Sequence, residues 1–159
     1  MGTKRKRSVQ IYNPCKALEV DDRAIESTFQ FLDGHAPYSI PDGALSLAFL
    51  EAPAHNQLHD EFLNDPSPTD VITFPGDPED DIVGEICVSI DTAYSYAKTH
   101  KLDFSQELTL YLVHGWLHLA GFNDSNDEDR QAMKKEEQVC MSMLETNSMI
   151  PMFKYLIDD

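Results

Sequence analysis

The stretch that decides the fold runs from residue 105 to residue 124 and reads SQELTLYLVHGWLHLAGFND. Within residues 108–120, the positions that are not apolar are Thr109, His114, Gly115 and His118. A segment this long and apolar on every side predicts a buried helix over about 105–120. Gly121 follows directly, and glycine at that point favours a left-handed turn that ends the helix. The sequence therefore predicts one buried helix that carries two histidines.

Two histidines and one aspartate in this stretch have the spacing of metal ligands. His114 and His118 are four positions apart, so on a helix their rings lie one turn apart on the same face. Asp124 follows the glycine turn, and the chain can there bring its carboxylate back toward both rings. An unpaired imidazole is costly to bury in an apolar helix, which favours a bound cation. Two nitrogens and one oxygen, with a fourth position left for water, are typical of a catalytic zinc site.

The expected ion is Zn²⁺, one per chain. Because Asp124 makes the site less positive than a third imidazole would, Mn²⁺ or another divalent metal is an alternative. Such an ion lowers the pKa of bound water and polarises a phosphoryl or carbonyl oxygen. Gly115 is expected to leave space for a substrate group beside the metal, and no residue is identified as the general base. Glu85 is a candidate for the cleft wall, with an exposed strand carboxylate as the alternative.

The other histidines lack this setting. His55 and His59 are also four positions apart, but without a glycine turn or an apolar surrounding they are expected at the surface. His35 and His100 are expected in loops or at helix ends, without a partner. Trp116 is expected in the core. Thr69 and Asp70 are expected to fix the entry to a strand through local hydrogen bonds.

Composition indicates one globular domain over residues 1–159, with 42% hydrophobic residues and a net charge of −16. Residues 1–7 are basic and expected to be a mobile terminus, and residues 146–159 are expected to be a tail. No apolar stretch approaches the roughly 18 residues that a membrane span needs. The cysteines are three and contain no C-x-x-C pair. These features predict a cytoplasmic protein without disulfides or membrane contact.

Hydrophobic periodicity predicts an α+β fold in which about five helices pack against a mixed four-stranded sheet. The expected strands cover residues 8–12, 44–50, 71–74 and 82–90. The expected helices cover about 21–33, 53–63, 91–98, 105–120 and 126–144, with Gly34 ending the first, Asp91 capping the third and Ser105 starting the fourth. An acidic turn or surface loop is expected at 76–81.

Three motifs resemble the YbeY family of bacterial rRNA-maturation proteins. HGWLHLAGFND at 114–124 resembles the family signature H-G-x-L-H-L-x-G-x-D-H. PTDVITFP at 68–75 is similar to P-T-D-V-L-S-F-P, and GEICVS at 84–89 resembles G-D-I-x-I-S, so that the likeness covers residues 44–145. The resemblance implies a metzincin-like zinc helix and a metal-dependent single-strand endoribonuclease that processes rRNA. The implied partners are rRNA and the small ribosomal subunit. A basic ribosomal protein is expected as a further partner because this chain has few cations of its own.

The chain departs from that family in two places. Asp124 stands where the family has histidine, and Asn123 precedes it in place of aspartate; a carboxylate is still a competent zinc ligand. At 58–66, LHDEFLNDP replaces L-N-R-E-Y-R-G-K-D, so the functional arginine of the family falls on Leu63. Arginine can hold a phosphate by a bidentate contact and leucine cannot. Since no Lys or Arg lies between Arg23 and Lys98, we expect the isolated chain to bind RNA weakly.

Two other functions remain open. The ligand spacing also suits metzincin-like metalloproteases, but these place a glutamate base directly after the first histidine, where this chain has Gly115. The second alternative is a metal-stabilised, ribosome-associated module without nuclease activity. The negative charge of the chain and the leucine at position 63 both support this second alternative.

Overall fold

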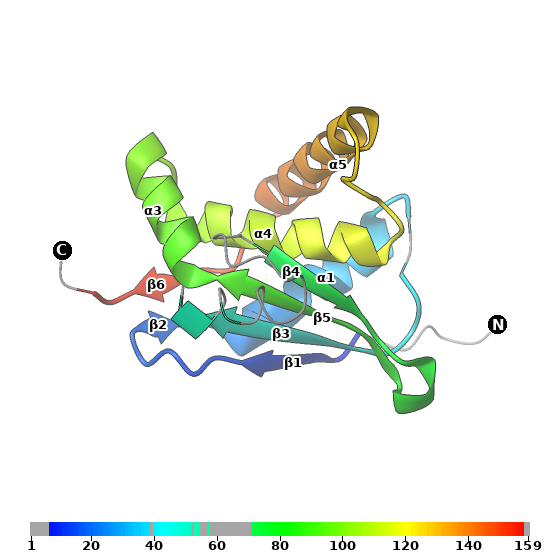
Figure 1. Ribbon diagram of the computed structural model, residues 1–159, viewed down its shortest axis with the longest axis horizontal. Helices are drawn as coiled ribbons and strands as arrows, with labels where there is room; N and C mark the ends of the chain where they lie inside the picture. The colour runs from blue at the N-terminus through cyan, green and yellow to red at the C-terminus, as the bar shows by residue number, and fades with distance from the viewer. Residues whose placement is uncertain (1–6, 39, 52, 55–56, 58–70, 158–159) are drawn as a thin grey trace.

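The central feature is a mixed four-stranded sheet with helices packed on one face (Figure 1). The computed structural model describes residues 7–38, 40–51, 53–54, 57 and 71–157. The sheet has the order β1-β3-β5-β4. Its strands are β1 (Val9–Tyr12), β3 (Ala44–Leu50), β5 (Ile82–Ser89) and β4 (Val71–Pro75). The first three are parallel and β4 is antiparallel to β5, which confirms the expected α+β fold and mixed sheet.

Alternate residues of the central strands form the core face of the sheet. Leu47 of β3 pairs with Ile86 of β5, and Phe49 pairs with Val88; all four side chains are fully buried beneath the helices. On the opposite face lies a smaller apolar cluster formed by Ala48, Ile72 and Cys87. Because successive side chains of a strand point to opposite faces, the alternation in the sequence places these side chains on two faces of the sheet.

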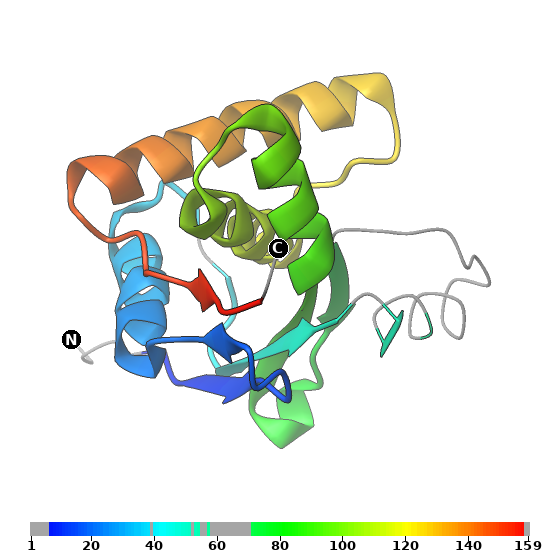
Figure 2. The ribbon, with the colours of Figure 1, turned by 90° about the vertical axis from the view of Figure 1, so that its left-hand side faces the viewer.

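Four helices have their bounds within the described residues. They are α1 (Asp22–His35), α3 (Ile90–His100), α4 (Phe104–Leu119) and α5 (Asp127–Thr146). Helix α4 lies against the sheet. Helix α5 crosses α4 on the side away from the sheet and forms an outer layer, and α3 packs beside α4 (Figures 1 and 2). This position confirms the prediction that the HGWLHL helix is buried, and Trp116 is fully covered as expected.

Several helix ends differ from their expected positions because capping residues lie one or two places away. Ser89 caps α3 by accepting from the Thr92 amide, so the helix begins before Asp91. Asp103 caps α4 through the Gln106 amide, and the helix therefore begins before Ser105. Gly34 lies inside α1, which ends at His35 with Ala36 as its C-cap.

The C-terminal segment, expected to be a tail, contains a strand and a buried side chain that pack into the fold. Strand β6 (Lys154–Tyr155) pairs antiparallel with β2 (Leu18–Glu19) in a second, two-stranded sheet. Phe153 is buried, and its backbone both donates to and accepts from the Ser105 hydroxyl, at 2.8 and 3.2 Å. These contacts fix the segment to the beginning of α4.

Arg7 also belongs to the folded part of the chain, contrary to the expected mobile terminus. Its side chain is 6% exposed and donates to the Asp33 carboxylate at 2.9 Å. It also donates to the carbonyls of Pro41 and Gly43. A buried charge needs such partners, and this one connects β1 to α1.

Some expectations fall on residues that the structure does not describe. Pro53, Ala54 and Gln57 are helical, and the rest of the expected helix 53–63 lies outside the described residues. The same holds for His55, His59, Leu63, Thr69 and Asp70. The expected acidic turn contains the 3₁₀ helix η1 (Pro78–Asp80).

The three cysteines lie in the interior of the protein. Cys15, Cys87 and Cys140 are buried thiols outside any disulfide, and burial raises the pKa of each. No disulfide joins them, as predicted. Among the residues that the structure describes, no helix is long and apolar enough to cross a lipid bilayer.

The positive φ of Gly121 at the end of α4 can be tested by substitution, with Gly34 of α1 as the matched control. Gly121 has φ of 104°, so Gly121→Ala is expected to lower the free energy of unfolding by about 1–2 kcal/mol, because a side chain is strained there. Gly34 is helical with open space around it, so Gly34→Ala is expected to raise the free energy of unfolding by about 0.5–1 kcal/mol. Urea denaturation measures both, and equal effects from the two substitutions would contradict the assignment.

Candidate metal centre

The chain reverses direction at the end of α4. The Gly121 amide donates to the His118 carbonyl at 3.1 Å, and the Phe122 amide donates to the Leu117 carbonyl at 3.0 Å. This pair of hydrogen bonds is the Schellman motif, which glycine permits by its positive φ. The turn returns Asp124 to the face of α4 that carries the histidines. The predicted left-handed helix end is thus present, and it positions the carboxylate.

The structure brings together the three residues that the sequence singles out. The Nε2 atoms of His114 and His118 are 3.1 Å apart, and Asp124 Oδ2 lies 3.5 Å from each of them. A tetrahedral ion with bonds of about 2.0–2.1 Å would separate its ligand atoms by roughly 3.3–3.4 Å. The observed triangle therefore fits one zinc-sized ion with little adjustment.

Hydrogen bonds on the far side of each ring set which nitrogen faces the site. His118 Nδ1 donates to the Phe122 carbonyl at 3.0 Å, and His114 Nδ1 donates to Glu137 Oε1 at 2.5 Å. A carbonyl or a carboxylate only accepts, so the hydrogen of each neutral ring lies on Nδ1 and both Nε2 atoms are acceptors. Two acceptors at 3.1 Å need a cation between them, either a metal ion or an added proton. Glu137, which the sequence analysis missed, is thus an outer partner of the site.

The site is partly open to water. The side chains of His114 and His118 are 23% and 25% exposed, and that of Asp124 is 48% exposed. A closed structural zinc site surrounds its ion with four protein ligands, whereas a catalytic site leaves a position open. Three converging ligands with an exposed carboxylate match the second arrangement.

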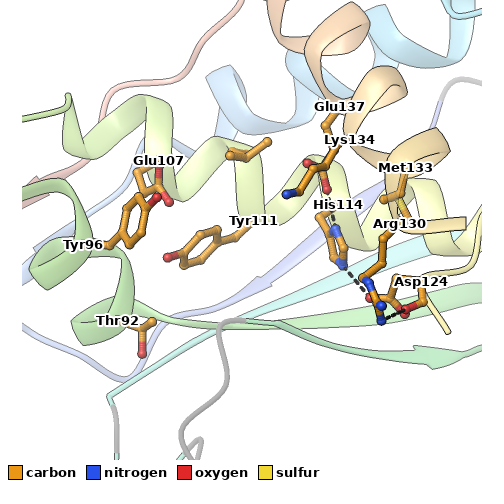
Figure 3. Close-up of a pocket in the computed structure, with 11 residues that line it drawn as sticks. Thr92, Tyr96, Glu107, Tyr111, His114, Asp124, Arg130, Met133, Lys134 and Glu137 are labelled. Carbon is orange, nitrogen blue, oxygen red and sulfur yellow. Dashed lines mark hydrogen bonds and ion pairs between the residues drawn. The ribbon is translucent and has the colours of Figure 1, made fainter. Parts of the chain in front are cut away.

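A cleft of about 580 Å³ begins at His114 and Asp124 and continues between α3, α4 and α5 (Figure 3). Its walls include the aromatic residues Tyr96 and Tyr111, the carboxylates Glu107 and Glu137, and two cations, Arg130 and Lys134. The cations come from α5, far along the chain from the family position that falls on Leu63. The sequence around residue 63 does not indicate these two cations, because they reach the cleft only through the packing of α5.

Gly115 serves helix packing, which corrects its expected role as substrate space. The residue is buried, and a Cβ atom there would lie 2.5 Å from Ile86 Cγ2 on strand β5. The missing side chain thus lets α4 approach the sheet, and Ile86 fills the space. Gly84 allows the same close approach, since a Cβ there would lie 2.6 Å from a Leu119 methyl group.

Glu85 is on the other face of the sheet. Ile86 points to α4, so its neighbour Glu85 points away from the helix, where its carboxylate accepts from the Ser46 hydroxyl and the Cys87 thiol. It does not line the cleft that contains His114. Burial and the adjacent Glu85 raise the pKa of Cys87. The sequence interpretation of Glu85 as a cleft wall is therefore wrong.

His35 and His100 lie in the last turns of α1 and α3, as expected, but each has a partner. The Nδ1 atom of each ring lies 2.9 Å from the carbonyl oxygen four residues earlier, and each ring stacks on the aromatic side chain of that same residue. Both are therefore satisfied within their own helices and lie apart from the metal centre.

Comparison with known proteins places the chain in a family. The family model described as Endoribonuclease YbeY matches residues 10–145, which include all three candidate ligands. The chain belongs to the YbeY family. This membership confirms the resemblance inferred from the HGWLHLAGFND motif.

Proteins named Endoribonuclease YbeY are similar to this chain over different lengths. One from Protochlamydia amoebophila is 42% identical over 97 residues, which cover 58% of this chain and 65% of that protein. One from Chlamydia trachomatis is 39% identical over 102 residues, covering 60% and 63%. The matched region thus spans slightly less than two thirds of these YbeY relatives. One from Chlamydia pneumoniae is 28% identical over 150 residues, covering 89% and 94%.

A solved structure shares the fold. The solution structure of a Thermotoga maritima protein superposes with a TM-score of 0.58 at 27% identity, covering 89% of this chain and 94% of that one. The two proteins therefore share the same fold.

Glu137 offers a test of the outer partner. Glu137→Gln removes the charge that holds the His114 ring and is expected to weaken metal affinity by about 10–100-fold. Titration of the metal-free protein against a chromogenic chelator measures the change. Glu136→Gln is the matched control, because the adjacent carboxylate contacts the Tyr38 hydroxyl instead. Equal affinities in the two variants would show that Glu137 does not tune the site.

Proposed function

We propose that this chain is a metal-dependent endoribonuclease that cleaves single-stranded RNA during rRNA processing and ribosome maturation in the cytoplasm. The observation that carries the proposal is the convergence of His114, His118 and Asp124 at one end of an open cleft. Family membership supports the reaction class, since the relatives bear the name endoribonuclease. The substrate implied is RNA of the small ribosomal subunit.

The residues divide into ligands and orienting groups. His114, His118 and Asp124 would hold Zn²⁺, with Mn²⁺ as the alternative. When bound, such an ion supplies Lewis-acid polarisation of the phosphodiester and a water molecule whose pKa is lowered toward neutrality. Glu137 and the Phe122 carbonyl keep the Nδ1 atoms protonated, which leaves both Nε2 atoms as ligands. Gly115 brings the ligand helix close to the sheet and holds it there.

A cleavage assay with matched variants tests this proposal. The metal-free protein is expected not to cleave a single-stranded oligoribonucleotide, and added Zn²⁺ or Mn²⁺ is expected to restore cleavage. His118→Ala, purified in the same way, is expected to remain inactive with metal, which controls for contaminating ribonuclease. A duplex of the same sequence is expected to resist cleavage. Cleavage that survives both metal removal and His118→Ala would contradict the proposal.

The alternative of a ribosome-associated module without nuclease activity is favoured by one observation, the net charge of −16, which opposes RNA binding by the isolated chain. Co-sedimentation with small ribosomal subunits, measured beside the cleavage assay, separates the two. Binding to the subunit without metal-dependent cleavage would favour the module. Metal-dependent cleavage of free RNA would favour the enzyme.

A further inference from the structure

Two cations of α5 lie on the wall of the cleft. Arg130 and Lys134 are four positions apart, and Glu137 is three further on, so all three lie along one face of the helix. The contact between Glu137 and His114 fixes the rotation of α5 about its axis. With Glu137 held at the metal centre, Lys134 and Arg130 must lie one and two turns earlier along the same cleft (Figure 3).

Arg130 reaches the loop that carries a metal ligand. Its guanidinium donates to the Asp124 carbonyl at 3.4 Å and pairs with the Asp127 carboxylate. The side chain of Arg130 is 52% exposed and that of Asp127 is 90% exposed, so this surface ion pair contributes little to stability. Arg130 can therefore readily exchange Asp127 for another anion. A guanidinium has five donors, so Arg130 can bind a phosphate beside the metal without leaving this loop.

Lys134 is the second residue of this wall that can bind a phosphate. Its side chain is exposed, and within the described part of the chain it has no ion-pair partner. The cleft therefore offers a planar donor group and a compact ammonium at successive turns of α5, both suited to phosphate oxygens.

The charge of the cleft makes its affinity for phosphate depend on the metal. Glu107, Asp124 and Glu137 contribute three negative charges, against the two positive charges of Arg130 and Lys134. A divalent ion changes the balance from negative to positive. We therefore expect a polyanion to bind much better to the metal-loaded protein than to the metal-free protein.

The opposite wall favours a nucleic acid over a free phosphate. Tyr96 of α3 lines the same cleft and is 45% exposed, although its ring also stacks on His100. Exposed aromatic rings beside basic grooves stack the bases of single strands. A cleft with cations on one wall and an aromatic ring on the other suits a single strand of RNA.

We propose that Arg130 and Lys134 are the phosphate-binding residues of this cleft, and that they hold the backbone of a single-stranded RNA beside the metal centre. The identity of the ligand as RNA rests on the proposed function. In this chain the two α5 residues then take over the task that the family arginine at the Leu63 position would perform.

Binding to a strand that resists cleavage tests the residues independently of catalysis. The probe is a fluorescein-labelled, single-stranded 2′-O-methyl oligoribonucleotide, titrated by anisotropy against metal-loaded protein over a series of salt concentrations. Arg130→Gln and Lys134→Gln are each expected to weaken binding by about tenfold. The double variant is expected to reduce the slope of log K against log salt by about 1.4, since each contact with a single-strand phosphate contributes about 0.7.

Lys135→Gln is the matched control. It changes the net charge equally at the next position of α5, but Lys135 is exposed and does not line the cleft. Metal content and thermal unfolding are measured for every variant and are expected to be unchanged. If Lys135→Gln weakens binding as much as Lys134→Gln, only overall charge matters and the proposal fails. The proposal would also fail if inorganic phosphate displaced the labelled strand as effectively as the unlabelled strand does at the same concentration.

The same variants separate this proposal from the proposed function. In the cleavage assay, the double variant is expected to raise KM while keeping most of kcat. Wild-type cleavage with unchanged KM and binding in the double variant would overturn the role of Arg130 and Lys134 and leave the nuclease intact. Binding that depends on both residues without any wild-type cleavage would support their role and remove the nuclease. A wild-type protein that does not bind the strand would overturn the role.

Discussion

Asp124→Ala is expected to leave the purified protein with far less than one metal ion per chain. Asp124 supplies one of three ligand atoms, and its Oδ2 lies 3.5 Å from both imidazole Nε2 atoms. Removing it leaves two histidines on one helix turn, which is too few ligands for a stable zinc site. The loss of affinity should exceed the roughly 10–100-fold that follows from removal of an outer partner such as Glu137.

Elemental analysis after dialysis measures the metal content directly, and thermal unfolding provides a second measurement. Added Zn²⁺ is expected to raise the Tm of the wild type, because a ligand that binds only the folded state stabilises it, but not that of the variant. Glu128→Ala is the control, since it removes an exposed carboxylate of the same segment that is not part of the ligand group. Stoichiometric, equally tight metal in Asp124→Ala would show that the carboxylate is not a ligand.

The effect of Gly115→Ala on the free energy of unfolding is expected to be opposite in sign in the wild type and in an Ile86→Ala background. In the wild type it should lower the free energy of unfolding by about 1–3 kcal/mol, because the added methyl group overlaps Ile86 and the close helix–sheet contact must open. Ile86→Ala alone should lower the free energy of unfolding by about 2–5 kcal/mol through the cavity it leaves. In that background Gly115→Ala fills part of the cavity and gains helix propensity, so it should stabilise the protein.

Urea denaturation of the four proteins gives this double-mutant cycle. Gly34→Ala, made in both backgrounds, is the control, because it lies on α1 with open space around it and should have the same effect in each. A Gly115→Ala effect that is equal in the two backgrounds would mean that Ile86 is not what the glycine accommodates.

The ligand helix was predictable because its information is local. Spacing of four places two rings on one helix face, and a glycine after the last turn ends the helix, wherever the helix then packs. The sheet strands were predictable for a similar reason, since alternation identifies both faces of β3 and β5. Capping residues shifted the helix starts by one or two positions, which patterns of apolar residues do not resolve.

The remaining site residues depend on tertiary packing. Glu137, Arg130 and Lys134 reach the cleft because α5 docks on α4, and no local pattern records where a helix docks. Their common face on α5, directly beside the buried side chains of Met133, Cys140 and Leu144, was the available signal. Gly115 was misread because its role depends on the distance between α4 and β5. The two-residue strands β2 and β6 are too short to show a period.

The contact between Glu137 and His114 links metal binding to the docking of α5 on α4. Any opening that lifts α5 from α4 must break this hydrogen bond and expose an imidazole that the metal requires in one tautomer. Metal binding therefore penalises the detached state of α5, and by thermodynamic reciprocity the docking of α5 strengthens metal binding by the same factor. The stability of α5 docking should therefore depend on whether the metal site is occupied, although α5 contributes no ligand atom.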